Sequence, residues 1–395
     1  MKILYVTHYF PPEVIANAVR VYEISKYLKA NGAWVEVLCP HPCFPPYSFE
    51  PCRSFYRREE MNELIVHRLY NYQVHDYTKF YLQRGLYYSV FPVLASLWIT
   101  RRAKNYDVVI TSTPPPATDL VGFTAKKFNK KILWIQDLRD LSVAVARDFR
   151  HIPNKFYDVV VRIYEKHLWD NIDLIASTTK RMSKDLQEKY NLPKEKFFSL
   201  PNATNLTIFK NRKLERENII VYAGNMGIYQ DLEKVILAMK YVNAKLYIIG
   251  GGEKRRDLEN LVNDKKLFNI LFFDKMSRDK LSRLLNKCKV GIAPLKDSVS
   301  LRYAMPSKVF DYVACGLAVL GTGSEGELKD FIENNNVGIM AKNNIGHIAE
   351  KLNFLLENFK EYSKNAFKVS KKHDRSVIVK KFYKRIEEEL DARNL

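Results

Sequence analysis

Glycines and amide side chains follow a strand-like run in the middle of the chain, where they could bind a phosphorylated ligand. The run IIVYAG (219–224) is followed by Asn225, Gly227 and Gln230. Glycine lets the backbone approach a charged ligand closely, and the two amides can donate hydrogen bonds. Because glycine turns follow many strands, this segment alone is equally consistent with a purely structural turn.

Residues 304–327 carry a more specific pattern. Pro306 and Ser307 predict the start of a helix, and Lys308 adds a cation at its positive end. Asp311 follows one turn later. A diphosphate could bind the helix start and Lys308, while Asp311 accepts both hydroxyls of a ribose. The alternative is that Asp311 is a surface residue and Ser307 only a helix cap.

The elements that must position these residues alternate between strand-like and helix-like runs. We predict strands at 2–7, 34–39, 107–112, 131–136, 174–178, 219–224, 245–250, 269–274, 290–295 and 318–323. We predict helices at about 18–31, 117–129, 153–170, 180–190, 231–242, 253–265, 278–287 and 307–314. Such alternation is typical of α/β proteins with parallel sheets.

A turn-rich stretch near residue 203 separates two series of these elements. We therefore predict two Rossmann-like, doubly wound domains, at 1–203 and 204–375. A final amphipathic helix at about 376–395 can pack back on the first domain. In such sheets ligands bind beyond the carboxyl ends of the strands.

The composition is that of a globular protein, with 395 residues, 47% of them hydrophobic and 27% charged. The five cysteines match no zinc framework, which favours a reduced cytoplasmic protein. Cys39, Cys43 and Cys52 cluster loosely, which leaves a metal or disulfide role open. The N-terminus runs directly into a strand pattern without a cleavable hydrophobic region, which also favours the cytoplasm.

The net charge of +20 suggests a polyanionic partner. No nucleic-acid-binding motif is found, so we expect no nucleic acid. Between Arg84 and Arg101 lies the uncharged stretch GLYYSVFPVLASLWIT, followed by Arg102 and Lys104. It is too short to span a bilayer, but aromatic and basic residues together are typical of an interfacial segment. The alternative is a buried helix interrupted near Pro92.

Seven ordered motifs of the sequence resemble family 4 retaining glycosyltransferases with the GT-B fold, in the branch that builds surface polysaccharides and lipid-linked glycans. They are YVTHYFPPE (5–13), TSTPPPATDLVG (111–122), IQDLRDL (135–141), LPNATNLTIF (200–209), YAGNMGIYQDLEKVI (222–236), IIGGGEKRRDLE (248–259) and PSKVFDYVACGLAVLGT (306–322). This resemblance implies two domains that close over an activated sugar.

The resemblance also implies the donor site. The donor would be a UDP- or GDP-sugar, with neither a metal nor a further cofactor. Its binding residues would be Gly224, Asn225, Gly227, Gln230, Gly251, Glu253, Lys275, Met276, Ser307, Lys308 and Asp311. Among them the glycine loop would lie under the diphosphate, and the backbone at Lys275 and Met276 would contact the base.

Three positions depart from the family pattern. Tyr303 stands where the first glutamate of the E-x7-E motif is expected. Asn225 and Gln230 replace the arginine and lysine that often hold the diphosphate, a charge that Lys308 can supply. Gln136 occupies the place of a frequent histidine of the first domain.

For catalysis we expect Lys308 and the N–H groups of residues 305–308 to hold the leaving diphosphate. Arg139 would approach it from the first domain, with Asp137 and Asp140 orienting sugar or acceptor hydroxyls. Alternatively, Arg139 pairs internally with one of these carboxylates. His8, just after the first strand, is either an acceptor-site group or a loop-packing residue.

The expected acceptor is a lipid-linked glycan or glycolipid, reached through peripheral contact with acidic lipid at the inner face of a membrane. Two rival functions remain, a catalytically silent partner subunit and a sugar-nucleotide epimerase of the same fold. A nicotinamide-dependent oxidoreductase is disfavoured, because the first strand leads into YFPPEVIANAV and not into G-x-G-x-x-G.

Overall fold

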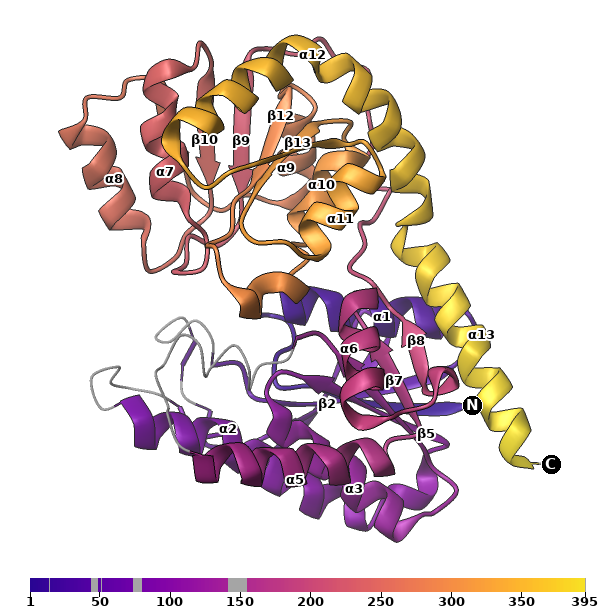
Figure 1. The fold of residues 1–395 in the computed structure, drawn as a ribbon. Coiled ribbons are helices and arrows are strands. Elements are labelled where there is room, and N and C mark those ends of the chain that lie inside the picture. The colour runs from indigo at the N-terminus through magenta and orange to yellow at the C-terminus, as the bar shows by residue number, and fades with distance from the viewer. Residues whose placement is uncertain (14, 44–48, 51, 74–79, 141–154, 395) are drawn as a thin grey trace. The chain divides into compact units, whose positions relative to one another are not determined.

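The computed structural model describes residues 1–13, 15–43, 49–50, 52–73, 80–140 and 155–394. The chain divides into two compact units. The first unit comprises Met1–Pro201 and Ile378–Leu395, and the second comprises Asn202–Val377. The predicted boundary at 203/204 lies two residues further along the chain, and the C-terminal segment is grouped with the first unit. Each unit is a doubly wound α/β structure, as expected (Figure 1).

An eight-stranded sheet with the order β3-β4-β2-β1-β5-β6-β7-β8 forms the centre of the first unit. Its strands are β1 (Lys2–Val6), β2 (Trp34–Pro40), β3 (Tyr56–Met61), β4 (Leu64–Leu69), β5 (Val108–Thr113), β6 (Leu133–Leu138), β7 (Leu174–Ser177) and β8 (Phe197–Ser199). Neighbouring strands are parallel except β3 and β4. Every residue of β5 and β6 is buried, and in both strands three apolar residues come first and are followed by polar ones.

The helices of the first unit are α1 (Ala16–Ala30), α2 (Phe80–Thr100), α3 (Asp119–Phe128), α5 (Lys155–Asn171), α6 (Lys180–Tyr190) and most of α13 (Arg375–Asn394). The helix α1 lies on one face of the sheet, and α2, α3 and α5 lie on the other (Figure 1). The predicted interruption near Pro92 is wrong, because α2 continues through it. Burial of Phe91, Ala95 and Ile99 against the sheet outweighs the hydrogen bond that the proline removes. The predicted start of α5 at 153 lies outside the described residues.

A hairpin that the sequence analysis missed closes one edge of this sheet. The strand β3 is exposed and polar, so it lacks the apolar pattern of a buried strand. Asn62 and Glu63 connect it to β4 with φ angles of 47° and 66°. Two positive φ angles are typical of a type I′ turn, here without the usual glycine.

A fully parallel six-stranded sheet with the order β11-β10-β9-β12-β13-β14 forms the second unit. Its strands are β9 (Ile219–Ala223), β10 (Lys245–Ile249), β11 (Ile270–Phe273), β12 (Val290–Ala293), β13 (Ala318–Thr322) and β14 (Gly338–Ala341). Its helices are α7 (Leu232–Ala238), α8 (Arg255–Asp264), α9 (Arg278–Leu285), α10 (Lys308–Ala314), α11 (Glu327–Asn334) and α12 (Ile345–Lys372). The elements β14, α11 and α12 were not predicted.

Candidate functional site

The strand order of the second unit places a ligand site at the end of β9. This strand lies between β10 and β12, so the chain turns in opposite directions on its two sides. Open α/β sheets bind ligands at such switch points, beyond the carboxyl ends of the strands. The loops that follow β9 and β12 meet there, because the Lys296 N–H donates a hydrogen bond of 2.9 Å to the Tyr229 carbonyl.

Glycines bring the loop after β9 into backbone contact with the loop after β10. A Cβ on Gly250 would lie 2.3 Å from the Gly224 carbonyl oxygen, and one on Gly252 would lie 2.4 Å from that of Met226. Gly224, Gly250 and Gly252 have φ angles of 151°, 127° and 144°. The Met226 N–H also donates 2.7 Å to Gly251 O. Both the close approach and the backbone conformation therefore require glycine at these positions.

Lys308 is half-buried and places its amine directly against this glycine loop. Its Nζ lies 3.6 Å from the centroid of the Tyr222 ring, and a Cβ on Gly224 would lie 3.0 Å from that Nζ. Burial lowers the pKa of the Lys308 amine well below its ordinary value. Among the described residues, no carboxylate pairs with it. A desolvated amine without a carboxylate partner is a suitable site for a phosphate group, which would restore its charge.

The amides after β9 stabilise the loop more than sequence reasoning suggested. The Oε1 atom of Gln230 accepts a hydrogen bond of 3.0 Å from the Gly227 N–H. The Nε2 group of Gln230 can still donate to a ligand, so its predicted role in donor binding stays a prediction. Asn225 is exposed, and it is its backbone carbonyl, not its amide, that accepts a hydrogen bond of 2.5 Å from the Tyr222 hydroxyl. Tyr222 was not singled out from sequence, although it directly precedes the glycine turn.

Asp311 lies one helical turn beyond Lys308, but it already has a protein partner. Its Oδ1 accepts a hydrogen bond of 2.6 Å from the Thr204 hydroxyl. The helix α10 begins at Lys308, and the exposed Ser307 makes no side-chain capping bond. Ser307 therefore occupies the N-cap position of α10, but without the side-chain hydrogen bond expected of a capping serine. A ribose at Asp311 would share the carboxylate with Thr204 or displace it.

The remaining donor-site candidates line the same edge of the sheet. Gly251 and Glu253 are exposed in the loop after β10, whose Lys254 N–H donates 3.0 Å to Met226 O. Lys275 and Met276 follow β11, and the Met276 side chain packs partly against the core. The structure thus brings these predicted residues to three adjacent loops beyond β9, β10 and β11.

In the first unit, Asp137 cannot orient a ligand as predicted, because it is fully buried and occupied. Its Oδ1 lies 2.8 Å from Arg20 Nη2, and its Oδ2 accepts 2.8 Å from the Tyr5 hydroxyl. Arg20 also donates to the carbonyls of Leu200 and Pro201, at 2.8 and 3.2 Å. A buried carboxylate with this set of partners is a structural ion pair, which corrects the sequence-based role.

Arg139 and Asp140 follow β6 and remain candidates. Burial lowers the pKa of the Arg139 guanidinium, and the nearby charges of Asp140 and Asp137 oppose that shift. Gln136, at the position of the family histidine, is buried and donates 2.7 Å to Asp119. Burial raises the pKa of Asp119 to about 7. Gln136 therefore belongs to the core.

His8 is buried beneath aromatic rings. Its ring centroid lies 4.7 Å from that of Tyr87 and 5.7 Å from that of Phe91, both on α2. Neither ring nitrogen has a hydrogen-bond partner in the part of the chain that the structure describes. Burial lowers the pKa of His8 to about 3, so the imidazole is neutral near pH 7. This environment favours the packing role over the acceptor role.

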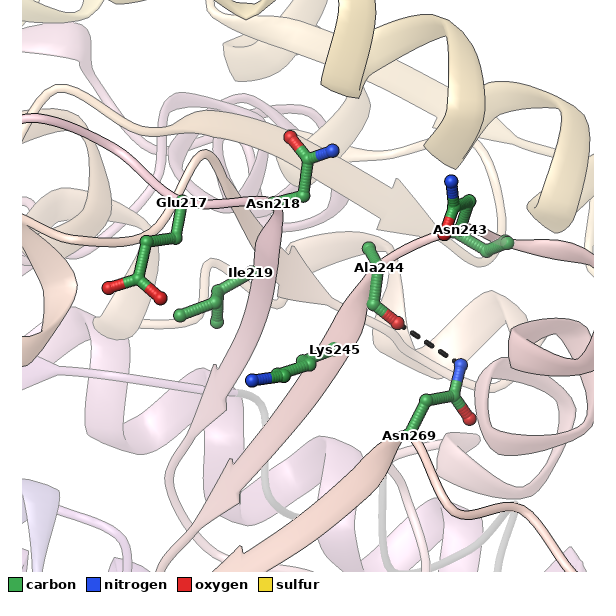
Figure 2. Close-up of a pocket in the computed structure, with 8 residues that line it drawn as sticks. Glu217, Asn218, Ile219, Asn243, Ala244, Lys245 and Asn269 are labelled. Carbon is green, nitrogen blue, oxygen red and sulfur yellow. Dashed lines mark hydrogen bonds between the residues drawn. The ribbon is translucent and has the colours of Figure 1, made fainter.

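A hollow in the second unit lies away from these loops (Figure 2). It is lined by Glu217, Asn218, Ile219, Val242, Asn243, Ala244, Lys245 and Asn269. These residues surround the amino ends of β9, β10 and β11, whereas the glycine loops follow their carboxyl ends. The side-chain amide of Asn269 donates hydrogen bonds to the backbone carbonyls of Met239 and Ala244. We therefore do not assign the donor to this hollow.

The described residues include no group of three or more His, Cys, Asp or Glu side chains arranged to hold a metal ion. The five cysteines are all free. Within the ranges covered by the structure, no helix combines the length and apolar character needed to cross a bilayer.

Two family models match successive parts of the chain. The model described as "Glycosyltransferase Family 4" matches residues 18–207, and "Glycosyl transferases group 1" matches residues 204–372. Together with the two doubly wound sheets, these matches define the class of protein. The chain is an enzyme of glycan synthesis that belongs to the family 4 glycosyltransferases with the GT-B fold.

Individual relatives are distant. The "Putative colanic acid biosynthesis glycosyl transferase WcaI" of Escherichia coli (strain K12) is 25% identical over 339 residues, which cover 80% of this chain and 82% of that protein. Sucrose-phosphate synthase from Thermosynechococcus elongatus shares the fold with a TM-score of 0.74, 15% identity and 99% coverage of both chains. Anabaena HepE in complex with UDP-glucose has a TM-score of 0.68, 13% identity and coverage of 99% and 100%.

Proposed function

We propose that this enzyme transfers a sugar from a nucleoside diphosphate sugar to a glycan acceptor with retention of the anomeric configuration. The observation that carries the proposal is the Lys308 amine, which is desolvated beside the Gly224 backbone and has no carboxylate partner among the described residues. A diphosphate leaving group develops negative charge as the glycosidic bond to the sugar breaks. Lys308 and the glycine loop would stabilise that charge.

Different residues would bind the nucleotide and the acceptor. Asp311 would bind the ribose, and the backbone after β11, at Lys275 and Met276, would contact the base. The loop after β10, with Gly251 and Glu253, would border the nucleotide. Arg139 and Asp140 remain candidates for the acceptor side, whereas Asp137 is withdrawn because its oxygens are occupied.

A thermal-shift screen of UDP- and GDP-sugars on the purified chain would identify the donor, because a ligand stabilises the form that binds it. Lys308→Ala should then lower nucleotide release by on the order of 100- to 1,000-fold, as for the loss of one charge-stabilising donor. Lys287→Ala, an exposed lysine at the amino end of β12, is the matched control. A fully active Lys308→Ala would overturn the site. An inverted anomeric centre in the product would overturn retention alone.

Asp311 offers a second test, because its hydrogen bond can be removed separately from its charge. Asp311→Ala should weaken UDP binding strongly if the carboxylate holds the ribose. Thr204→Val removes the bond between Thr204 and Asp311 while keeping the carboxylate. Equal losses in the two variants would mean that Asp311 serves the fold and not the ligand.

For the acceptor we propose a lipid-linked glycan reached by peripheral contact with acidic membrane. The net charge of +20 supports contact with an acidic membrane, and the colanic acid biosynthesis in the name of the relative WcaI supports a glycan acceptor. Transfer to a polyprenyl-linked glycan should exceed transfer to the same glycan without the lipid. Equal kcat/KM for both would argue against the lipid-linked acceptor without affecting the donor site.

A further inference from the structure

The helix α2 has two apolar faces, although a helix on a sheet needs only one. Tyr87 and Phe91 point inward, to the ring of His8 and the core. Leu86, Val93 and Leu97 point outward and are 41%, 48% and 64% exposed. These three positions follow the spacing i, i+7 and i+11, which places them on one side of a helix. The outer side of α2 is therefore an apolar stripe without a protein partner among the described residues.

The neighbouring helix α3 also exposes apolar side chains. It packs beside α2 (Figure 1), and its Leu120 and Phe128 are 42% and 49% exposed. The C-terminal ends of the two helices are joined, since Asn129 Nδ2 donates 3.2 Å to Ala103 O. We define the α2–α3 surface as these five apolar side chains together with five exposed cations at the ends of the two helices. The apolar side chains are Leu86, Val93, Leu97, Leu120 and Phe128.

Five cations gather where α2 and α3 end. They are Arg101, Lys104, Lys127, Lys130 and Lys131, and all are exposed. In the described parts of the chain, none of these five side chains makes a hydrogen bond or an ion pair. Residues 85–131 contain seven lysines and arginines but only two carboxylates, Asp107 and the buried Asp119. The charge of this region is therefore positive and largely uncompensated.

We propose that the α2–α3 surface docks on an anionic phospholipid membrane. The exposed apolar side chains would enter the boundary between headgroups and acyl chains, and the five cations would face lipid phosphates. A nucleic acid would use the cations but leave the apolar stripe in water, so the combination favours lipid. Docking at this surface would bring the enzyme to a lipid-linked acceptor, and this purpose rests on the proposed function. The docking itself does not depend on that function.

The inner face of α2 indicates how docking would serve transfer. Tyr87 and Phe91 contact His8, which lies two residues beyond the end of β1. The N-terminal half of α2 therefore lies at the carboxyl edge of the first sheet, where open α/β sheets bind their ligands. A membrane along the outer face of α2 would lie on the other side of the same helix from that edge.

Co-sedimentation of the full chain with vesicles tests the surface. Vesicles of phosphatidylcholine with about 30% phosphatidylglycerol should bind the enzyme at low salt, and binding should weaken at high salt. The triple variant Lys127→Gln, Lys130→Gln, Lys131→Gln should weaken binding by on the order of 100-fold, taking about 1 kcal/mol per cation at the surface. Leu97→Ser should weaken it about tenfold through lost apolar burial.

Matched variants on the second unit serve as controls. Lys364→Gln, Lys368→Gln, Lys372→Gln removes the same charge from exposed positions on α12, and Phe354→Ser removes an apolar side chain that is 46% exposed. Both should bind vesicles as the wild type does. Equal losses in the α3 and α12 variants would reduce the effect to net charge and overturn the proposal.

Two further outcomes would also overturn it: no binding of the wild type to anionic vesicles, or a wild-type dimer that Leu97→Ser converts to monomer. The second would make the apolar stripe an interface between copies of the chain. UDP stabilisation and transfer to a water-soluble acceptor without vesicles should be unchanged in the surface variants. A failed membrane test with intact transfer would therefore leave the proposed function standing.

Discussion

Replacing Asp137 by Asn should destabilise the first unit without acting on catalysis directly. The substitution keeps the shape of the side chain but removes its charge. Arg20, whose side chain is 2% exposed, would then lose its partner carboxylate and keep its hydrogen bonds to the Leu200 and Pro201 carbonyls. Removing one partner of a buried ion pair typically costs about 3–5 kcal/mol, because the other charge stays buried without compensation.

A loss of unfolding free energy of this size can be measured as a change in melting temperature. The first unit has about 200 residues, for which 1 kcal/mol shifts the melting temperature by roughly 2–4 °C. We therefore expect Asp137→Asn to lower the melting temperature of the first unit by about 10 °C. Glu388→Gln, which breaks the exposed pair with Lys384, should change it by less than about 1 °C, since exposed pairs contribute little.

Calorimetry of each variant, together with kcat measured well below the transition, separates the two roles of Asp137. The double variant Arg20→Met, Asp137→Leu should recover much of the stability, because it removes both buried charges. An Asp137→Asn enzyme with wild-type melting and a kcat lowered by orders of magnitude would refute our reasoning. It would return Asp137 to the acceptor site.

Three further predictions concern pH and the glycine loops. Because burial lowers the folded-state pKa of His8 to about 3 from 6.5, the unfolded chain binds a proton that the folded chain does not as pH falls below 6.5. Urea unfolding should therefore show a loss of about 1.4 kcal/mol per pH unit, or about 2 kcal/mol at pH 5, that His8→Phe abolishes. UDP affinity should fall as pH rises and the Lys308 amine loses its proton. The fall should begin well below pH 10.5, because burial lowers the pKa of Lys308. Lys308→Arg should remove this pH dependence, and a flat profile in the wild type would contradict the prediction. Gly252→Ala should weaken UDP binding roughly tenfold or more, since its Cβ would lie 2.4 Å from Met226 O at a φ of 144°. The control Gly346→Ala lies in α12, away from the glycine loops, and its Cβ would come no closer than 3.9 Å to Asn344 Oδ1, so UDP binding should be unchanged.

Most strands of the two central sheets could be predicted because buried parallel strands contain short apolar runs. Residues 108–110 in β5 and 290–293 in β12 are examples. The edge strand β3 could not be found in this way, because it is exposed and polar. The helix break that Pro92 predicts does not occur, since burial of the residues around it overrides the local preference of proline against helix.

The candidate donor site could be anticipated as a set of loops but not as a geometry. The glycines after β9 and β10 were singled out as turns, yet only the fold brings Gly252 to the Met226 carbonyl. Similarly, the sequence predicted that Lys308 binds phosphate. The contact between its amine and the Tyr222 ring, however, joins residues that are 86 positions apart in the chain.

The sequence by itself determined the family, the doubly wound α/β class and the loops that carry the polar residues, because periodicity and local motifs are properties of neighbouring residues. Only the tertiary structure decided which of those residues are accessible. Asp137 and Arg139 are two positions apart in one motif, yet Asp137 is fixed by Arg20, which comes 117 residues earlier. Whether a carboxylate meets a ligand or a buried arginine depends on long-range packing, which no local pattern encodes.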